Sequence, residues 1–142
     1  MDYAFWDASA LVPLCVMQRT TPAAQALSEQ YRMAVWWSTP VEVRGAFARL
    51  VRMGQLTSNG QVQSQVTLEE LRSIWREVDP SENLREQAER LVDRFPLKAA
   101  DAQQLAAAMT WCGGRTKGRV FISGAGQLLE AARQLGFHAV EA

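Results

Sequence analysis

The sequence has few of the residues that build the commonest small metal and disulfide sites. Its 142 residues include one histidine, His138, and two cysteines, Cys15 and Cys112. Three such residues, far apart in the chain, do not form the closely spaced Cys and His pairs that bind zinc. Because both cysteines lie in apolar segments, we expect two buried free thiols and a reducing, cytoplasmic location.

Long apolar runs and an excess of either charge are also missing. The run at residues 10–17 is much shorter than the roughly 20 residues that cross a bilayer. The start of the chain lacks a basic segment, and Asp2 and Asp7 interrupt it. We therefore expect neither a secretory signal nor contact with a membrane. With 15 basic and 15 acidic residues the formal net charge is zero, so any contact with nucleic acid would need a local basic surface or a bound metal ion.

The composition itself is that of an ordinary globular protein. Hydrophobic residues make up 48% and charged residues 21% of the chain, which is enough apolar side chain for one core. No repeat or linker-like segment divides the sequence, so we expect residues 1–142 to form a single domain.

Short apolar runs alternate with helical patterns along the chain. Strands are expected at residues 3–6, 34–37, 120–122 and, as an edge strand, 137–140. Helices are expected from residue 10, at 22–33, at 40–54, twice between 55 and 96, at 98–112, and from residue 124 or 126. Helical connections between strands imply parallel pairing with right-handed crossovers. The predicted class is α/β, with three α/β/α layers around a central, mostly parallel sheet.

Two local patterns fix further expectations for the helices. Hydroxyl residues at Ser9, Thr21 and Thr39 stand where side chains cap helix N-termini, the last two before a proline. Between residues 68 and 78, apolar side chains recur every three or four positions, which predicts one helix running to Val78.

Three acids stand where α/β enzymes place functional groups. Asp7 follows the first strand, and the carboxyl ends of parallel strands are where ligands bind in open sheets. Glu42 and Asp101 fall in the first turns of two helices, and both are flanked by apolar residues. Each acid has a purely structural alternative, because acids at these positions also cap helices or interact with the helix dipole.

Together, the three acids favour a metal site. Buried carboxylates that meet would repel one another and lose solvation, which disfavours their charged forms. A hard divalent cation such as Mg²⁺ or Mn²⁺ removes that penalty and takes oxygen ligands. Such an ion can activate water and stabilise charge on a phosphoryl group, so neither histidine nor a covalent nucleophile would be needed.

The motifs around these acids resemble those of PIN domains. The resemblance lies in four segments in the family's order: residues 7–12, D-A-S-A-L-V; residues 41–43, V-E-V, followed by Ala46 and Arg49; residues 100–108, A-D-A-Q-Q-L-A-A-A; and residues 121–123, F-I-S, followed by Leu128, Ala131 and Ala132. Length and motif order match across essentially the whole chain. The chain is similar in particular to VapC-type toxins.

The resemblance implies a metal-dependent ribonuclease that hydrolyses RNA phosphodiester bonds with metal-activated water. Asp7, Glu42 and Asp101 match the family's catalytic metal ligands, with Mg²⁺ or Mn²⁺ as the cofactor. Ser9 and Ser123 match hydroxyls that support those ligands, although Ser9 has its capping role as an alternative. VapC-type toxins pair with a small antitoxin protein and commonly dimerise, so the resemblance implies both kinds of partner.

The sequence departs from the family at two positions. PIN domains usually carry a fourth acid after the strand that precedes the last helix, in a pattern like T-x-D; here residues 123–126 read S-G-A-G, with Ala125 at the acid's position. Pro13 replaces a common lysine. A degenerate PIN-like module that binds RNA or protein without cutting is therefore an alternative. A metal-dependent phosphatase or phosphotransferase is another, although no D-x-D motif follows the first strand.

Candidate RNA contacts are the arginines and lysine nearest these motifs. They are Arg44 on the second acidic helix and Arg115, Lys117 and Arg119 in a basic loop before the strand at 120–122. Solvation without a ligand is the alternative interpretation for each of them.

Overall fold

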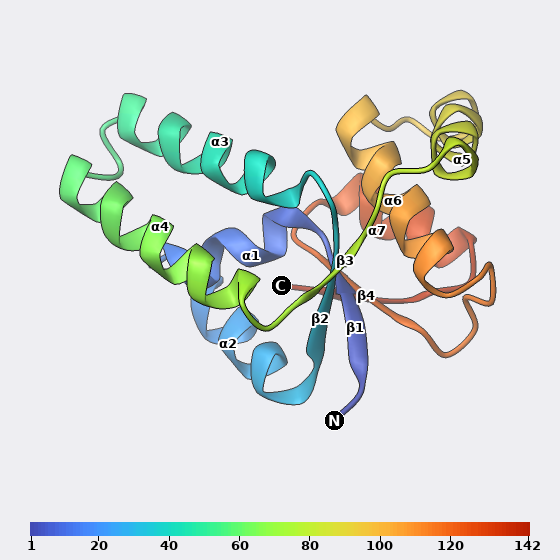
Figure 1. Ribbon diagram of the computed structural model, residues 1–142, viewed down its shortest axis with the longest axis horizontal. Helices are drawn as coiled ribbons and strands as arrows, with labels where there is room; N and C mark the ends of the chain where they lie inside the picture. Colours follow the sequence, from blue (N-terminus) through green and yellow to red (C-terminus); the bar gives the residue numbers. More distant parts are fainter.

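The computed structural model describes residues 1–142 as five strands and seven helices (Figure 1). The strands are β1 (Tyr3–Trp6), β2 (Arg32–Trp36), β3 (Arg76–Val78), β4 (Val120–Ser123) and β5 (His138–Glu141). The helices are α1 (Ala8–Cys15), α2 (Thr21–Gln30), α3 (Thr39–Arg52), α4 (Ser58–Arg72), α5 (Glu82–Arg94), α6 (Ala99–Trp111) and α7 (Gly126–Gln134). None of these helices combines the length and the hydrophobicity that crossing a bilayer would require.

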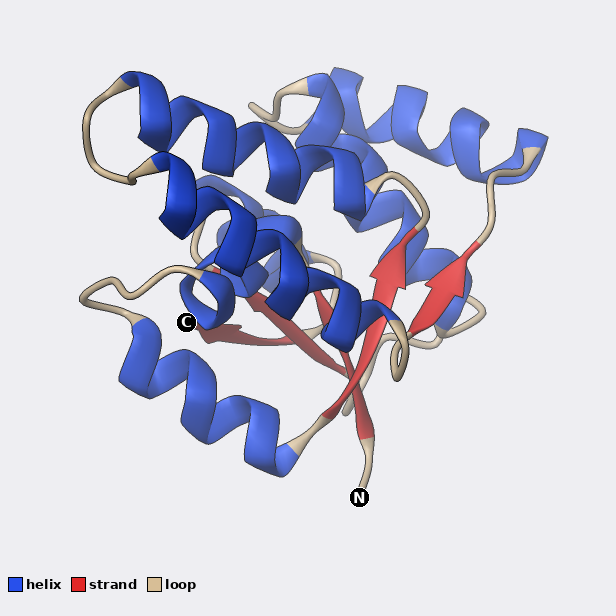
Figure 2. Ribbon diagram, turned by 60° about the vertical axis from the view of Figure 1, so that its left-hand side comes forward, coloured by secondary structure: helices blue, strands red, loops and turns tan.

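All five strands are parallel and form one sheet in the order β3-β2-β1-β4-β5. Helices cover both faces, so the predicted three-layer α/β/α class is confirmed (Figure 2). The strand at residues 138–141 lies at the edge of the sheet, as expected. Because every connection between neighbouring strands contains a helix, each face receives its cover from the crossovers.

Alternate residues of the central strand build the two cores. Phe5 belongs to a cluster with buried side chains of α5, α6 and α7, while Ala4 and Trp6 belong to a cluster with α1, α3 and α4. This alternation is the period of two that places successive side chains of a strand on opposite faces. Figure 1 shows the two helical layers on the left and the right of the sheet.

The structure corrects the prediction between residues 68 and 78. Helix α4 ends at Arg72, and residues 76–78 form β3, a short edge strand that pairs with β2. Ile74, which the helical pattern placed on a buried stripe, is 71% exposed. The apolar spacing of three or four residues continued by coincidence across a change from helix to strand.

The three expected N-caps also differ from the prediction by one or two residues. Asp7, Thr20 and Ser38 precede α1, α2 and α3. Thr21 lies inside α2 and donates its hydroxyl to the carbonyl of Pro13 at 2.6 Å. Thr39, inside α3, accepts a hydrogen bond from a distant glutamine, described below. The hydroxyls of Thr21 and Thr39 therefore connect separate elements instead of capping their own helices.

Candidate active site

Asp7 is the most constrained of the three acids. It follows β1 at the carboxyl edge of the sheet, its backbone N–H donates to the carbonyl of Ile122, and its side chain is only 3% exposed. It is also the N-cap of α1, because Oδ2 accepts the backbone N–H of Ser9 at 3.3 Å. Asp7 therefore both caps α1 and is a candidate metal ligand.

Two serine hydroxyls converge on the same carboxylate oxygen. The Oγ of Ser123, at the end of β4, lies 2.9 Å from Asp7 Oδ2, and the Oγ of Ser9 also hydrogen-bonds that oxygen. Each hydroxyl accepts a backbone N–H in turn, Ser9 from Gly124 at 2.9 Å and Ser123 from Ala125 at 3.0 Å. With their oxygens so engaged, both hydroxyls can donate to Asp7, which fixes its orientation and leaves Oδ1 available.

Glu42 lies in the first turn of α3, half-buried, and is held from the opposite helical layer. Gln104 of α6, which is fully buried, donates Nε2 to Glu42 Oε2 at 2.7 Å and to Thr39 Oγ1 at 3.2 Å. Burial, together with the negative charges of Asp7 and Asp101, raises the pKa of Glu42 to about 7, while the hydrogen bond from Gln104 opposes the rise.

Asp101 lies in the first turn of α6, one helical turn before Gln104. Burial raises the pKa of its carboxyl, and the neighbouring Lys98 partly offsets that rise. Burial also raises the pKa of Asp7, opposed by the hydrogen bonds of Ser9 and Ser123 and reinforced by the charge of Asp101. The three predicted site acids therefore share one electrostatic environment at the carboxyl edge of the sheet.

The three acids do not form a closed ligand set in this arrangement. No three acidic, histidine or cysteine side chains stand close enough together to enclose a metal ion. The chemistry of the donors nevertheless suits a hard cation, since all are carboxylate oxygens and their repulsion is what a divalent ion would relieve.

Gln104 is the residue that sequence reasoning missed. It is a fully buried polar side chain in an alanine-rich helix, three positions after Asp101 and therefore on a neighbouring part of the helix surface. A glutamine among alanines, one turn from a candidate ligand, is a usable signal, because a buried amide needs hydrogen-bond partners.

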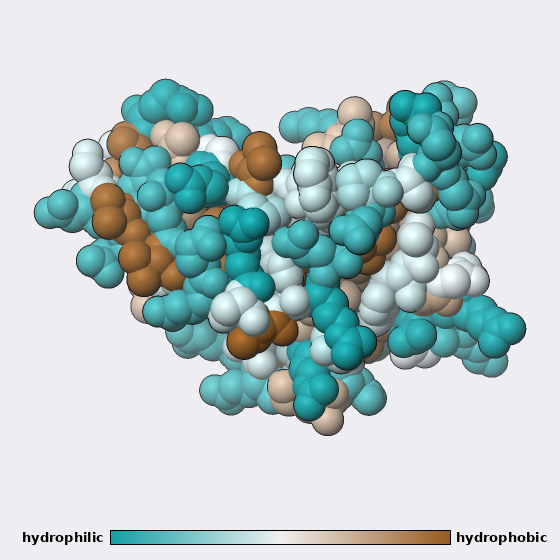
Figure 3. Space-filling model, in the orientation of Figure 1, coloured by the Kyte–Doolittle hydropathy of each residue, from teal (hydrophilic) through white to brown (hydrophobic).

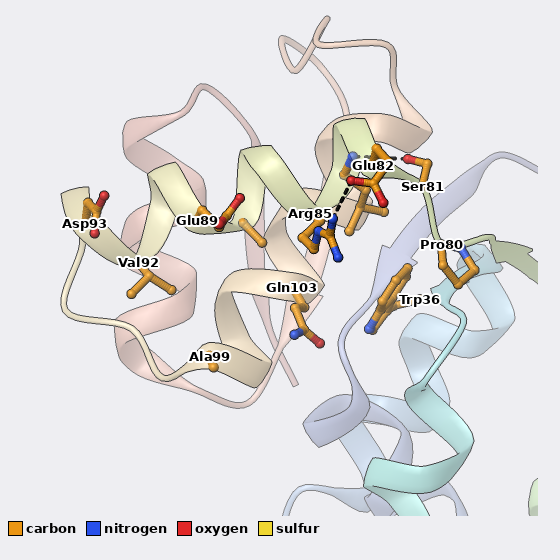
Figure 4. Close-up of a pocket in the computed structure, with 12 residues that line it drawn as sticks. Trp36, Pro80, Ser81, Glu82, Arg85, Glu89, Val92, Asp93, Ala99 and Gln103 are labelled. Carbon is orange, nitrogen blue, oxygen red and sulfur yellow. Dashed lines mark hydrogen bonds and ion pairs between the residues drawn. The ribbon is translucent and has the colours of Figure 1, made fainter.

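A hollow opens between β2, α5 and the first turns of α6, and none of the three acids lines it (Figure 4). Its volume is about 850 Å³, and Trp36, Arg85 and Gln103 approach it from these three elements. The one basic side chain in its lining, Arg85, pairs with Glu82, and Glu89 and Asp93 add further negative charge. This hollow therefore repels phosphate on its α5 side.

The predicted RNA contacts do not gather around the acids. Arg44 is exposed on α3, two residues after Glu42, and lines a shallow hollow with Glu69 and Glu70 of α4. Arg115, Lys117 and Arg119 lie between the end of α6 and the start of β4, at the amino edge of the sheet. Helix α6 starts beside the acids and runs away from them for 13 residues. At a rise of about 1.5 Å per residue, the loop that follows α6 lies at the opposite end of the molecule from the acids.

Comparison with known proteins finds similarity in structure but none in sequence. No family model matches the chain, and no curated protein matches it. A chain of a toxin–antitoxin complex from Klebsiella pneumoniae has a TM-score of 0.59 at 22% identity, covering 86% of this chain and 86% of that chain. PAE2754 from Pyrobaculum aerophilum has a TM-score of 0.67 at 19% identity, covering 99% of this chain and 89% of that chain. The fold is thus one already seen in solved structures, over nearly all of the chain.

Proposed function

We propose that this protein is a metal-dependent endoribonuclease of the PIN type, and the toxin of a toxin–antitoxin pair. The observation that carries the proposal is the buried Asp7, oriented by Ser9 and Ser123 and coupled electrostatically to Glu42 and Asp101. A carboxylate that only capped α1 would not need two additional hydroxyl donors from separate elements.

Asp7, Glu42 and Asp101 would hold Mg²⁺ or Mn²⁺. When bound, the ion would supply a nucleophilic water and stabilise negative charge on the scissile phosphate. The chain's own residues prepare the ligands: Ser9 and Ser123 fix Asp7 with one oxygen free, and Gln104 orients Glu42 from the opposite helical layer. Fixed ligands lower the reorganisation required on binding, which is the usual role of groups behind a metal site.

Partners of two kinds follow from the proposal. The similarity to a chain of a toxin–antitoxin complex supports a small antitoxin protein as one partner. A homodimer is the second. Trp37, in the turn before α3, and Val41, in the first turn of α3, are 54% and 73% exposed and provide apolar surface for either contact. Arg44, on the same helix, is the candidate RNA contact nearest to Glu42.

A binding module that does not cut is the second candidate function. It is favoured by Ala125, which stands at the N-cap of α7 where PIN domains usually carry a fourth acid, and by the open arrangement of the other three. This alternative predicts weak Mg²⁺ and Mn²⁺ binding and no cleavage.

The test is cleavage of a mixed pool of structured RNAs with Mg²⁺, with Mn²⁺ and with chelator. Asp7→Asn and Asp101→Asn proteins, purified identically, control for contaminating nucleases. Metal-dependent cutting by the natural sequence that both variants lose would establish the nuclease. No cutting in any metal would favour the binding module.

A further inference from the structure

The amino edge of the sheet carries a second hollow, at the opposite end from the three acids. Its volume is about 980 Å³. Its lining includes Tyr3, Tyr31, Arg76, Trp111, Arg119 and His138. These residues come from the starts of strands across the whole width of the sheet and from the end of α6. In Figure 3 hydrophilic side chains gather at this lower end of the molecule, around the N-terminus.

Aromatic rings hold three guanidinium groups in place at this edge. The Cζ atoms of Arg76 and Arg32 lie 4.8 Å and 5.8 Å from the ring centre of Tyr3, and that of Arg119 lies 4.9 Å from the ring centre of Trp111. The strand register explains the pairing, since Tyr3 is opposite Arg32 in the parallel ladder. Stacking leaves the N–H edges of a guanidinium free, which is how arginine presents a planar fork to a phosphate.

These positive charges lack acidic partners. The ion pairs of the molecule join other residues, and none includes Arg32, Arg76 or Arg119. Asp2 is the one acid in the lining, and it makes no ion pair there. Glu77, next to Arg76, accepts the indole N–H of Trp75 instead. Two cations on the ring of Tyr3 repel one another, and a bound anion would relieve that repulsion.

We propose that this amino-edge hollow binds nucleotide units, with phosphates on Arg76 and Arg119 and a base against the aromatic lining. Phosphate fits the two guanidinium forks, and the ring of Tyr31 and the planes of the arginines offer stacking surfaces for any base. The adjacent loop with Arg115 and Lys117 extends the positive surface along a strand of nucleic acid. A zero net charge overall makes this concentration of unpaired cations more significant.

The site is independent of metal and of the proposed nuclease. Its residues lie at the other end of the sheet, and none of them is a candidate metal ligand. Free mononucleotides and single-stranded RNA present the same phosphate and base, so both are candidate sources of the ligand. Binding should persist in chelator and in Asp7→Asn protein, which separates failure of this proposal from failure of the nuclease.

The experiment is fluorescence anisotropy of a labelled single-stranded oligoribonucleotide with the full chain in chelator. We expect binding by the natural sequence and by Asp7→Asn, and at least about tenfold weaker binding by the Arg76→Ala, Arg119→Ala double variant, since each loses a charge-assisted hydrogen bond. The matched control is Arg94→Ala, because Arg94 is also exposed and stacks on a ring, 4.8 Å from the centre of Phe95, but lies outside the hollow. Thermal melting of each variant checks that the fold is kept.

Salt and competition identify the ligand. The slope of log binding constant against log salt should fall by about 0.7 for each phosphate contact removed. A mononucleotide that competes better than tripolyphosphate or an oligoglutamate supports the nucleotide site, and competition by RNA alone assigns it to a strand. Three results would each overturn the proposal. They are equal competition by all the anions, RNA affinity unchanged in the Arg76→Ala, Arg119→Ala double variant, and a loss of RNA affinity in Arg94→Ala equal to that in the double variant.

Discussion

The two edges of one parallel sheet hold their charged side chains in different ways. At the carboxyl edge the three acids are buried or half-buried, and two of them are hydrogen-bonded, Asp7 by two hydroxyls and Glu42 by Gln104. At the amino edge the arginines are exposed and stacked, with Arg76 over Tyr3 and no acidic partner. A hydrogen bond fixes one atom of a carboxylate, whereas stacking fixes the plane of a guanidinium and leaves its edge free.

The difference follows from which elements begin and end at each edge. Helices α1, α3, α6 and α7 start near the carboxyl edge, and their unpaired first-turn N–H groups favour acids and capping hydroxyls. The amino edge receives helix ends and strand starts, where positive side chains are favoured. Deep burial suits a group that must hold a small cation, and exposure suits one that meets a large anion.

The largest expected effect is at Asp7. Asp7→Asn keeps the N-cap of α1, because asparagine caps as well as aspartate, but removes the charge. We expect a loss of RNA cleavage of about 100-fold or more, since even residues behind a metal ligand cost about 10–100-fold. Initial cleavage rates in Mn²⁺ measure it, and an equal melting temperature in chelator shows that the fold is unchanged.

That result would separate the two edges. If Asp7→Asn cut RNA as fast as the natural sequence, the carboxyl edge would hold only a capping acid, and the comparison between a metal edge and a phosphate edge would fail. Asp2→Asn, an exposed acid at the amino edge, is the matched control and should cleave normally.

Ser123→Ala should have the next largest effect. It removes the hydroxyl 2.9 Å from Asp7 Oδ2 and leaves that buried oxygen with fewer donors. We expect Mn²⁺ affinity to fall about 10-fold or more, and stability at neutral pH to fall by about 1–3 kcal/mol. Titration calorimetry and urea unfolding measure the two.

The control for Ser123 is Ser28→Ala, which removes a surface hydroxyl that donates to a carbonyl of its own helix. Metal affinity unchanged in Ser123→Ala would mean that Asp7 is oriented by Ser9 and α1 alone. The hydrogen bond from β4 would then belong to the packing of the sheet.

The parallel sheet, the order of every element except β3, and the places of the three acids could be predicted from the sequence because each has a local signal. Asp7 directly follows an apolar strand, and Glu42 and Asp101 directly follow helix starts. Parallel strands separated by helices must bring their carboxyl ends to one edge, so the placement of three distant acids along that edge follows from topology without any knowledge of contacts.

What could not be predicted depends on tertiary contacts. β3 has three residues and only one strand neighbour, so no apolar alternation distinguishes it from the end of a helix. The contact of Gln104 with Glu42 joins residues 62 apart, and the basic loop could be placed relative to the acids only by following the direction of α6. Spacing in the sequence carries none of this information.

Glu42 should make the stability of the metal-free protein depend on pH. The pKa of Glu42 in the folded protein, about 7, exceeds its ordinary value of 4.5. The protonated side chain therefore adds its full contribution to the free energy of unfolding below the unfolded pKa, and this contribution is lost as pH rises through the folded pKa. Since the side chain is partly exposed, we expect a loss of about 1–2 kcal/mol between pH 5 and 8. Urea unfolding in chelator measures it, and added Mg²⁺ should restore stability at pH 8.

Glu42→Gln removes the titrating group and should flatten this profile. Glu29→Gln, on α2 away from the acids, should leave it unchanged. A profile just as steep in Glu42→Gln would show that Asp7 or Asp101 carries the pH dependence.

Ala125→Asp introduces an acid at the position where PIN domains usually carry their fourth acid and this chain has alanine. Ala125 is the N-cap of α7 with extended backbone angles, φ −101° and ψ 116°, and provides no side-chain cap. An aspartate there should stabilise the fold by about 1 kcal/mol in Mg²⁺ through capping and increase metal affinity. Ala125→Asn is the matched control, because it caps without adding charge; equal metal affinity in the two variants would mean that the missing acid does not limit the site.

The smallest effect is expected at the amino edge, and it tests whether the unpaired arginines repel one another. Arg76→Ala removes one of two guanidinium groups from the ring of Tyr3 and should cost about 0.5–1 kcal/mol at high salt, the usual strength of an exposed cation–π contact. At low salt the cost should shrink, because losing Arg76 also relieves repulsion from Arg32 that salt otherwise screens. Arg94 is the single cation over the ring of Phe95, so the stability cost of Arg94→Ala should not shrink at low salt. Urea unfolding at the two salt concentrations measures the difference, and an Arg76→Ala cost that grows at low salt would mean that this edge is already neutralised and has no need of an anion.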